Sequence, residues 1–360
     1  MIELLGKSKE ELPALCAAMG EPGYRGAQLY HALYAERKFD VAQMTNLPAA
    51  FRERLAKETR ITLPRICQKF ASTDGSVRYL FGLENSLSVG NDAALRPASV
   101  EAVFMPSEGR QTICVSTQAG CAVNCQFCLT AQLGLIRNLT PGEILAQVLL
   151  PLEENRSASP SDPIQTNVVL MGQGEPLLNF DSVMAALRIM LDPEGIGLSP
   201  KHVTLSTSGI VPGIEKLGAE KVRPKLAISL NASNDEQRDV LMPINKKYPL
   251  KKLLAACRAY PLRPWEHLTF EYVMLGGVND SAEDAHRVVR LLAPLKRVKV
   301  NLIPWNPGEL PYRESIPERI EMFRRILTEK GIPAFVRYSR GRDVMAACGQ
   351  LALLQIQTPA

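Results

Sequence analysis

The chain has 360 residues, of which 46% are hydrophobic and 22% are charged, and its formal net charge is +5. This length and composition predict a globular protein with one large core, and the modest positive charge permits an RNA partner without requiring one. The sequence has no apolar run of about 18 residues that could span a membrane, and its N-terminus, MIELLGKSKEELPAL, is too polar for a signal peptide. We therefore expect a cytoplasmic protein with no membrane partner.

The first part of the chain predicts a small helical module. Ser8 and Glu11 form a capping box before a short amphipathic stretch, and two further helical stretches cover residues 23–36 and 49–58. Two β-like runs follow, at 61–72 and 76–83, on either side of the turn signal Thr73-Asp74-Gly75. They predict a hairpin at the joint between two parts of the chain.

From about residue 100 onward the sequence alternates between strand and helix six times. The expected strands cover 111–117, 167–172, 202–208, 225–230, 268–275 and 299–305, and the expected helices cover 141–154, 181–191, 211–220, 250–260, 282–295 and 317–331. This alternation predicts an α/β fold whose parallel sheet curls into an open barrel, with an active site at the carboxyl ends of the strands. The Ser/Pro-rich stretch 155–165 is interpreted as a loop within the first crossover. We divide the chain into a helical module with its hairpin, 1–95, and a barrel domain, 96–360.

A cysteine cluster lies directly after the first expected strand of the barrel. The stretch GCAVNCQFC places Cys121, Cys125 and Cys128 within eight residues, out of eight cysteines in the chain. Without a secretory signal, such cysteines favour metal or redox chemistry over structural disulfides. Three thiols can hold a [4Fe–4S] cluster that keeps one iron open, whereas a structural zinc ion would need a remote fourth ligand.

Several motifs carry a resemblance to a known family. CxxxCxxC with Phe127 before the last cysteine resembles the signature of radical S-adenosylmethionine enzymes, in which the cosubstrate chelates the fourth iron. MGQGEPLLN, VTLSTSG, LAISLNASNDEQRD, MPINKKY, GGVND, NLIPWNP and RGRDVMAACGQL are similar to motifs of the radical methyltransferases that act on carbon 2 of adenine in 23S ribosomal RNA. The resemblance covers nearly the whole chain. It implies a partial (β/α)6 radical-SAM barrel with an N-terminal RNA-binding module, a [4Fe–4S] cluster and S-adenosylmethionine.

The residues expected to contact the cosubstrate follow the strands at one rim of the barrel. Gly174 allows a ligand to approach the backbone closely, Glu175 can accept a hydrogen bond from an ammonium group, and serine hydroxyls suit ribose or carboxylate groups. Each would look the same in an ordinary turn or helix cap. The resemblance implies that the cosubstrate contacts are Gly174, Glu175, Ser206, Ser229, Asn231 and Asn306. Asn231 stands where the family pattern has histidine.

The resemblance also implies a catalytic role for two cysteines outside the cluster. Cys348 would be the thiol that is methylated and then converted to a carbon radical, and Cys114 would release the product by displacing the sulfur as a disulfide. Glu101 would be the base that removes the carbon 2 proton. Without the resemblance, a buried thiol and a salt-bridged carboxylate are the commoner roles of such residues.

Basic residues suggest where RNA could bind. They gather at Lys246, Lys247, Lys251 and Lys252, at Lys296, Arg297 and Lys299, and at Arg337, Arg340 and Arg342, with Arg25 in the helical module. Charge clusters are usually only solvated surface. The implied partners are 23S rRNA (adenine 2503), tRNA (adenine 37) and an electron donor such as flavodoxin or ferredoxin. The sister methyltransferase of adenine carbon 8 and a non-catalytic zinc or RNA-binding protein remain alternatives.

Overall fold

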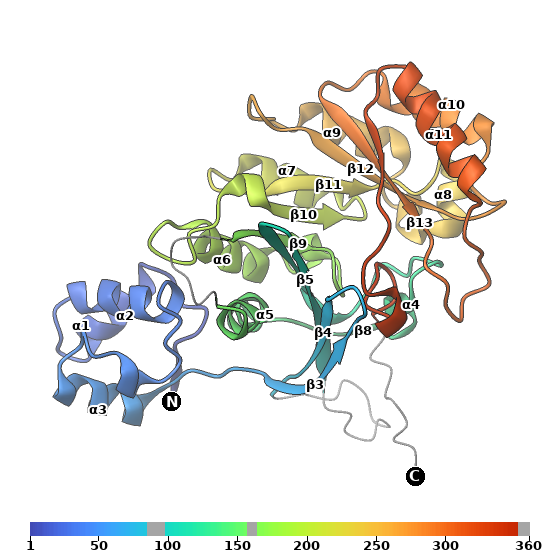
Figure 1. Ribbon diagram of the computed structural model, residues 1–360. Coiled ribbons are helices and arrows are strands. Elements are labelled where there is room, and N and C mark those ends of the chain that lie inside the picture. Colours follow the sequence, from blue (N-terminus) through green and yellow to red (C-terminus); the bar gives the residue numbers. More distant parts are fainter. Residues whose placement is uncertain (85–97, 157–163, 352–360) are drawn as a thin grey trace, which may run out of the picture.

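The computed structural model describes residues 1–84, 98–156 and 164–351 (Figure 1). Its main element is one ten-stranded sheet in the order β14-β13-β12-β11-β10-β9-β6-β5-β4-β3. These strands are β3 (Arg65–Ala71), β4 (Val77–Gly82), β5 (Ser99–Ser107), β6 (Arg110–Cys114), β9 (Gln165–Leu170), β10 (Val203–Thr207), β11 (Lys225–Ser229), β12 (Leu268–Met274), β13 (Val298–Pro304) and β14 (Ala334–Val336). The seven strands from β6 and β9 to β14 are parallel, and β3 to β6 form an antiparallel meander.

Helices fill the crossovers between the parallel strands. They are α5 (Pro141–Glu154), α6 (Phe180–Leu191), α7 (Val211–Ala219), α8 (Asp235–Leu241), α9 (Leu250–Ala259), α10 (Ala282–Leu292) and α11 (Pro317–Glu329). Within the described residues the edge strands β3 and β14 do not pair with each other, so the sheet stays open. The predicted partial barrel is therefore confirmed.

Local sequence signals explain where the helices begin. Thr140 accepts a hydrogen bond from the backbone N–H of Glu143, and the Glu143 carboxylate accepts one from the backbone of Thr140, with Pro141 as the first helical residue of α5. The same reciprocal arrangement of Ser281 and Asp284 starts α10. Such caps satisfy N–H groups that a helix leaves free at its start.

The N-terminal module packs against the barrel as part of the same core. Helices α1 (Glu11–Ala18), α2 (Tyr24–Tyr34) and α3 (Ala49–Glu58) confirm the three predicted helices, and β1 (Ile2–Glu3) pairs with β2 (Thr59–Arg60) beside them. Ser8 and Glu11 form the predicted capping-box hydrogen bonds. Tyr30 is buried and donates a hydrogen bond of 3.1 Å to Asp192, which follows α6. The module thus has a defined orientation relative to the sheet (Figure 1).

The structure extends the predicted fold at both edges. The predicted hairpin forms as β3 and β4, and its second strand pairs with β5, so it belongs to the same sheet as the barrel. Helix α8 and a seventh parallel strand, β14, were not part of the six predicted units. The proposed boundary at residue 95 and most of the 155–165 loop lie outside the described residues.

The C-terminal segment returns to the mouth of the barrel. After β14 it passes back toward the loop that contains α4 (Leu129–Gln132), as the red trace in Figure 1 shows. The backbone N–H of Leu129 donates to the carbonyl oxygen of Gly349, and the Thr130 hydroxyl donates to that of Leu351. This return brings the last described residues to the carboxyl ends of the strands. In the described parts of the chain, none of the helices is both long and apolar enough to cross a membrane.

Candidate active site

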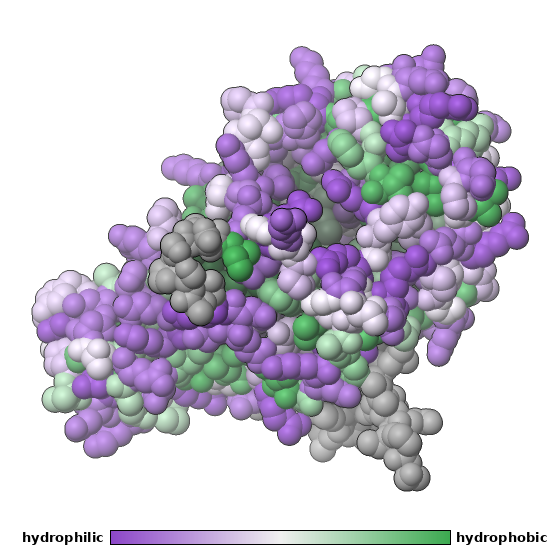
Figure 2. Space-filling model, viewed as in Figure 1, coloured by the Kyte–Doolittle hydropathy of each residue, from purple (hydrophilic) through white to green (hydrophobic). Residues whose placement is uncertain are grey.

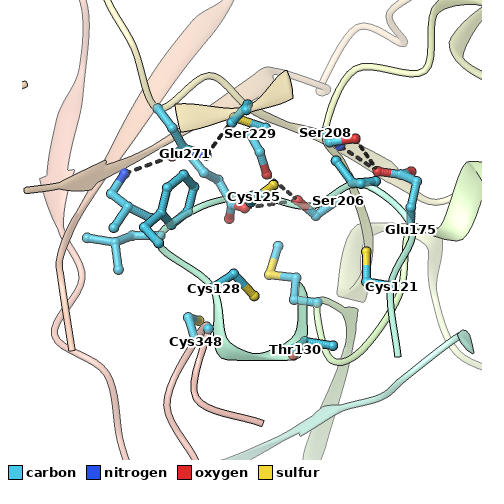
Figure 3. Close-up of a pocket in the computed structure, with 18 of the residues that line it drawn as sticks. Cys121, Cys125, Cys128, Thr130, Glu175, Ser206, Ser208, Ser229, Glu271 and Cys348 are labelled. Atoms are coloured by element: carbon cyan, nitrogen blue, oxygen red, sulfur yellow. Dashed lines mark hydrogen bonds between the residues drawn. The ribbon is translucent and has the colours of Figure 1, made fainter. Parts of the chain in front are cut away.

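A cavity of about 170 Å³ lies at the carboxyl ends of the parallel strands. Its lining includes the three clustered cysteines and all six residues that we expected at the cosubstrate, namely Cys121, Cys125, Cys128, Gly174, Glu175, Ser206, Ser229, Asn231 and Asn306. Cys348 also lines it, next to Cys128 in Figure 3. Seen from outside, the molecule is hollowed near the middle of the face in Figure 2, with mostly hydrophilic residues around the hollow.

The clustered cysteines lie on the loop between β7 (Gln118–Gly120) and α4. The backbone N–H of Cys128 donates to the carbonyl oxygen of Cys125 at 3.2 Å, which closes a turn. The indole N–H of Trp305, beyond β13, donates to the carbonyl oxygen of Phe127 at 3.2 Å. The loop is therefore held by its own turn and by the far side of the barrel.

The surroundings of these thiols suit metal ligands. Burial raises the pKa of Cys121 to about 12 and raises the pKa of Cys125 and Cys128 above the usual range. Charge on the neighbouring thiols raises the pKa of Cys125 further, while the buried guanidinium of Arg238 lowers it. A metal bound to sulfur offsets this cost of ionisation, so three thiols on one cavity fit an iron–sulfur cluster. In the described ranges, no three His, Cys, Asp or Glu side chains form a site for a single metal ion.

The Gly174-Glu175 turn joins two strand ends. Gly174 has φ +97°, and a Cβ there would lie 2.7 Å from the backbone nitrogen of Gln118, so glycine is required. The buried Glu175 carboxylate accepts hydrogen bonds from the backbone N–H and the hydroxyl of Ser208, both 2.7 Å, and from the N–H of Leu177 at 3.0 Å. Burial raises the pKa of Glu175, and these bonds oppose that effect. A carboxylate has about four acceptor positions, so Glu175 can still accept from a ligand.

A carboxyl group that the sequence analysis did not single out lies opposite the cysteine loop. Glu271 of β12 accepts a hydrogen bond of 2.9 Å from the Ser206 hydroxyl, and the hydroxyl oxygens of Ser206 and Ser229 are 3.5 Å apart (Figure 3). Ser229 and Glu271 are register partners in adjacent strands. Burial raises the pKa of Glu271. This group of two hydroxyls and a carboxyl is suited to binding a polar ligand such as a ribose.

Asn231 uses its side chain to link strand ends. Its φ is +56°, in the left-handed region that asparagine tolerates. The side-chain oxygen accepts a hydrogen bond of 2.9 Å from the N–H of Val273, and the amide nitrogen lies 3.4 Å from the sulfur of Met242. Asn231 lines the cavity, but much of its amide is already engaged by the protein.

Asn306 connects the cavity to the loop that carries Cys348. Its amide nitrogen donates to the hydroxyl of Ser339 at 2.9 Å and to the carbonyl oxygen of Cys348 at 3.1 Å. It can therefore influence the position of that cysteine as well as line the ligand space.

Cys348 lies between two cavities. A second cavity of about 290 Å³ is lined by Cys348 together with Cys114, at the end of β6, and by Arg337 and Tyr338 after β14. Cys348 is exposed to the space of these cavities, yet the surrounding protein raises its pKa to about 12, first through burial and then through the charge of Glu271. Burial likewise raises the pKa of Cys114. All eight cysteines are free thiols in this structure, so it contains no disulfide between Cys114 and Cys348.

Glu101, the expected base, lies in β5 and is fully buried. Its carboxylate forms an ion pair with the buried guanidinium of Arg78 and accepts a weak hydrogen bond of 3.4 Å from the Gln173 amide. It is not among the residues that line the two cavities. Val103 lies two residues after Glu101 in β5 and is paired with Cys114 of β6 in the sheet.

Three contributors to the site were missed in the sequence. Glu271 is a charged residue inside the apolar run LTFEYVML, and this pattern could have indicated a functional carboxyl group. Ser208 has the sequence context of an ordinary turn, so the sequence did not distinguish it. Arg238 is completely buried and donates to the carbonyl oxygens of Ser208, Ser229 and Leu230. In the sequence it is one of many arginines on helices, so only the fold distinguishes it.

Comparisons with known proteins agree with this geometry. Residues 115–291 match the radical SAM superfamily, and residues 2–61 match the N-terminal domain of the ribosomal RNA large subunit methyltransferases. A probable dual-specificity RNA methyltransferase RlmN of Koribacter versatilis is 49% identical over 94% of this chain and 99% of its own length. The dual-specificity RNA methyltransferase RlmN of Anaeromyxobacter dehalogenans is 45% identical over 97% of this chain and 91% of its own length.

A solved structure shows the same architecture. The crystal structure of a radical SAM methyltransferase from Sphaerobacter thermophilus has a TM-score of 0.88 and 41% identity, and the match covers 98% of this chain and 99% of that one. One family match lies in the barrel and the other in the helical module, and both curated relatives match this chain over nearly its whole length, which includes both parts. The chain therefore belongs to the RlmN family of radical S-adenosylmethionine RNA methyltransferases, whose members use a [4Fe–4S] cluster.

Proposed function

We propose that this chain methylates carbon 2 of an adenine in 23S ribosomal RNA and in transfer RNA, with Cys348 as the carrier of the methyl group. The observation that supports this reading most is the position of Cys348, which lines one cavity with the clustered cysteines and a second cavity with Cys114. A residue that carries a group from a cosubstrate to an RNA base has to face both spaces.

The cavity with the three cysteines is suited to the cluster and its cosubstrate. Cys121, Cys125 and Cys128 would hold the cluster, and the cosubstrate would contact Gly174, Glu175, Ser206, Ser229, Asn231 and Asn306. When bound, these two groups supply a sulfonium methyl group and a 5′-deoxyadenosyl radical. Glu175 would orient the amino group of the cosubstrate, and the buried Arg238 places a positive charge near the thiolate of Cys125.

The remaining steps involve the protein's own side chains. Carbon 2 of adenine has no lone pair, so a nucleophilic thiolate is needed to take the methyl group first, and Cys348 has that role. The methyl group on the sulfur would then lose a hydrogen atom to the 5′-deoxyadenosyl radical, and the resulting methylene radical would add to carbon 2. The adduct would lose one electron, which the cluster would accept when bound, and the carbon 2 proton. Glu101 would accept that proton after its buried side chain moves toward the cavity.

Cys114 would release the product. Its thiolate attacks the sulfur of Cys348, a disulfide forms, the bond from that sulfur to the methylene carbon breaks, and a proton completes the methyl group on the base. An external dithiol then reduces the disulfide before the next cycle. Both thiols line the second cavity, so such an exchange needs only local movement.

RNA contact would involve both parts of the chain. The residues 1–95 would form an accessory unit that helps to hold the RNA, and 96–360 would form the catalytic unit. Lys246, Lys247, Lys251, Lys252 and Arg337 are exposed, whereas Arg340 and Arg342 are engaged with Asp74 and Glu314. We place the enzyme in the cytoplasm, where its RNA substrates occur, with a one-electron donor such as flavodoxin or ferredoxin.

The direct test is anaerobic reconstitution of the cluster followed by reaction with a ribosomal RNA fragment and with a transfer RNA. We expect a brown protein that cleaves S-adenosylmethionine and RNA that contains 2-methyladenosine after nuclease digestion and mass spectrometry. Methylation at carbon 8 alone would refute the proposed product, and a protein that binds zinc and leaves the cosubstrate intact would refute the radical reaction.

A further inference from the structure

Tyr338 lies at the second cavity and is unusually exposed for an aromatic residue. Its exposed fraction is 63%, and it lines this cavity together with Arg337, Cys114 and Cys348. Scattered exposed aromatic residues are common and need no explanation. This one differs because it borders the space that holds both thiols outside the cluster loop.

The backbone around Tyr338 is anchored on both sides. The N–H of Arg337 donates to the carbonyl oxygen of Leu302 at 2.8 Å, and the hydroxyl of Ser339 accepts from Asn306 at 2.9 Å. Arg340 forms an ion pair with Asp74. In contrast, Tyr338 itself has no hydrogen bond of its hydroxyl and no ring contact among the residues that the structure describes. A rigid support thus presents a free ring.

A free aromatic face beside a cationic group is suited to a nucleotide. Every base has an apolar π-face that stacks on an aromatic side chain, and proteins that bind unpaired RNA use such rings with arginine beside them. The neighbouring Arg337 is exposed, and its guanidinium lies 5.4 Å from the ring centre of Phe335, with its Nε 3.4 Å from the Asn301 side-chain oxygen. It supplies a positive charge at the same edge for a phosphate.

We propose that Tyr338 is a stacking platform for the RNA nucleotide adjacent to the target adenine, with Arg337 binding the phosphate beside it. The target base must reach the two thiols, and the walls near them include the apolar residues Met105, Val169 and Ile303. Tyr338 is too exposed to form that inner space, so its ring meets the next nucleotide outside it. This inference depends on the proposed RNA methylation.

Binding and kinetics of three variants test this role in the reconstituted enzyme. Tyr338→Ala removes the ring, and we expect the Kd for an RNA hairpin with adenine in its loop, and the KM for its methylation, to rise about tenfold. Tyr338→Phe keeps the ring and should bind as wild type does. Trp265→Ala is the matched control, because Trp265 is 36% exposed and precedes β12, at the opposite end of the strands from the site.

A second measurement uses the wild-type protein, so it does not depend on the folding of a variant. A hairpin with 2-aminopurine next to the target adenine should lose fluorescence on binding, because stacking on Tyr338 quenches the probe. Three results would each overturn the stacking role. They are equal Kd values for wild type and Tyr338→Ala, a loss of affinity in Tyr338→Phe as large as that in Tyr338→Ala, and unchanged 2-aminopurine fluorescence when the wild-type protein binds. If the wild-type enzyme methylates no RNA, the proposed function itself is refuted, and this result differs from the results that refute the stacking role alone.

Discussion

Asn306 holds Cys348 through the backbone, since its amide nitrogen donates a hydrogen bond of 3.1 Å to the Cys348 carbonyl oxygen. The same amide bonds to Ser339, so one side chain links the end of the barrel to two points of the C-terminal segment. The loop that carries the proposed methyl acceptor is therefore positioned by a residue that lines the same cavity as the clustered cysteines. This relationship predicts that binding of the cosubstrate and methyl transfer to Cys348 both depend on Asn306.

Replacing Asn306 with Ala should slow methylation of Cys348 by at least tenfold, because the loop loses its anchor and the cosubstrate would lose a contact that we propose. Alkylation of Cys348 by iodoacetamide, followed by mass spectrometry, should become faster as the loop loosens. Ser339→Ala removes only one of the two bonds, so its effect should be smaller. Unchanged alkylation and methylation in Asn306→Ala would show that the loop is fixed by other contacts.

The cysteine cluster should tolerate no substitution. Cys125→Ala leaves two thiols for a cluster that needs three, so iron content and cleavage of S-adenosylmethionine should fall to background. Cys67→Ala is the control, because Cys67 is an exposed thiol on β3 that lines neither cavity. Full cosubstrate cleavage by Cys125→Ala would show that a different residue binds the cluster.

The two remaining cysteines of the site should fail at different stages. Cys348→Ala has no methyl acceptor and should give neither methylated RNA nor a covalent adduct. Cys114→Ala can still form the adduct but cannot resolve it, so the protein should remain attached to RNA as a nuclease-sensitive band on a denaturing gel. Glu101→Gln should produce a similar trap, because the carbon 2 proton stays in place. Normal turnover by Cys114→Ala would mean that this thiol is only a buried residue.

Asn231 should tolerate histidine better than alanine. A histidine is among the residues that accept a positive φ, and a ring nitrogen can accept the hydrogen bond from Val273. Asn231→His should therefore keep activity within a few-fold of wild type. Asn231→Ala leaves that N–H without its acceptor, which costs about 1–3 kcal/mol of unfolding free energy. A gain of orders of magnitude in Asn231→His would reveal an acid–base role at this position.

The buried ion pair of Arg78 and Glu101 should contribute more to the free energy of unfolding than an exposed ion pair does. Arg78→Met leaves the Glu101 carboxylate buried without its guanidinium partner, and urea unfolding should show a loss of about 3–5 kcal/mol. Adding Glu101→Gln to this variant should restore part of that loss, because the buried charge is gone. Arg188→Met, which breaks an exposed pair with Glu220, should change stability by less than about 1 kcal/mol. Equal losses in both arginine variants would contradict this difference.

The sequence alone determined the architecture and the cluster loop. Alternation of apolar strands with amphipathic helices is a local property, so the six units, the three N-terminal helices and the hairpin were predicted within a few residues. The spacing of Cys121, Cys125 and Cys128 is also local, and it predicted a cluster-binding loop before any contact was known.

Tertiary structure decided which distant side chains share a space. The closeness of Ser206 to Glu271, the burial of Arg238 and the position of Cys348 between two cavities depend on strand order and on the returning C-terminal segment. These contacts join residues far apart in the chain, and no local pattern encodes them. The engagement of Asn231 by Val273 and of Glu101 by Arg78 likewise became visible only when strand register placed the partners side by side.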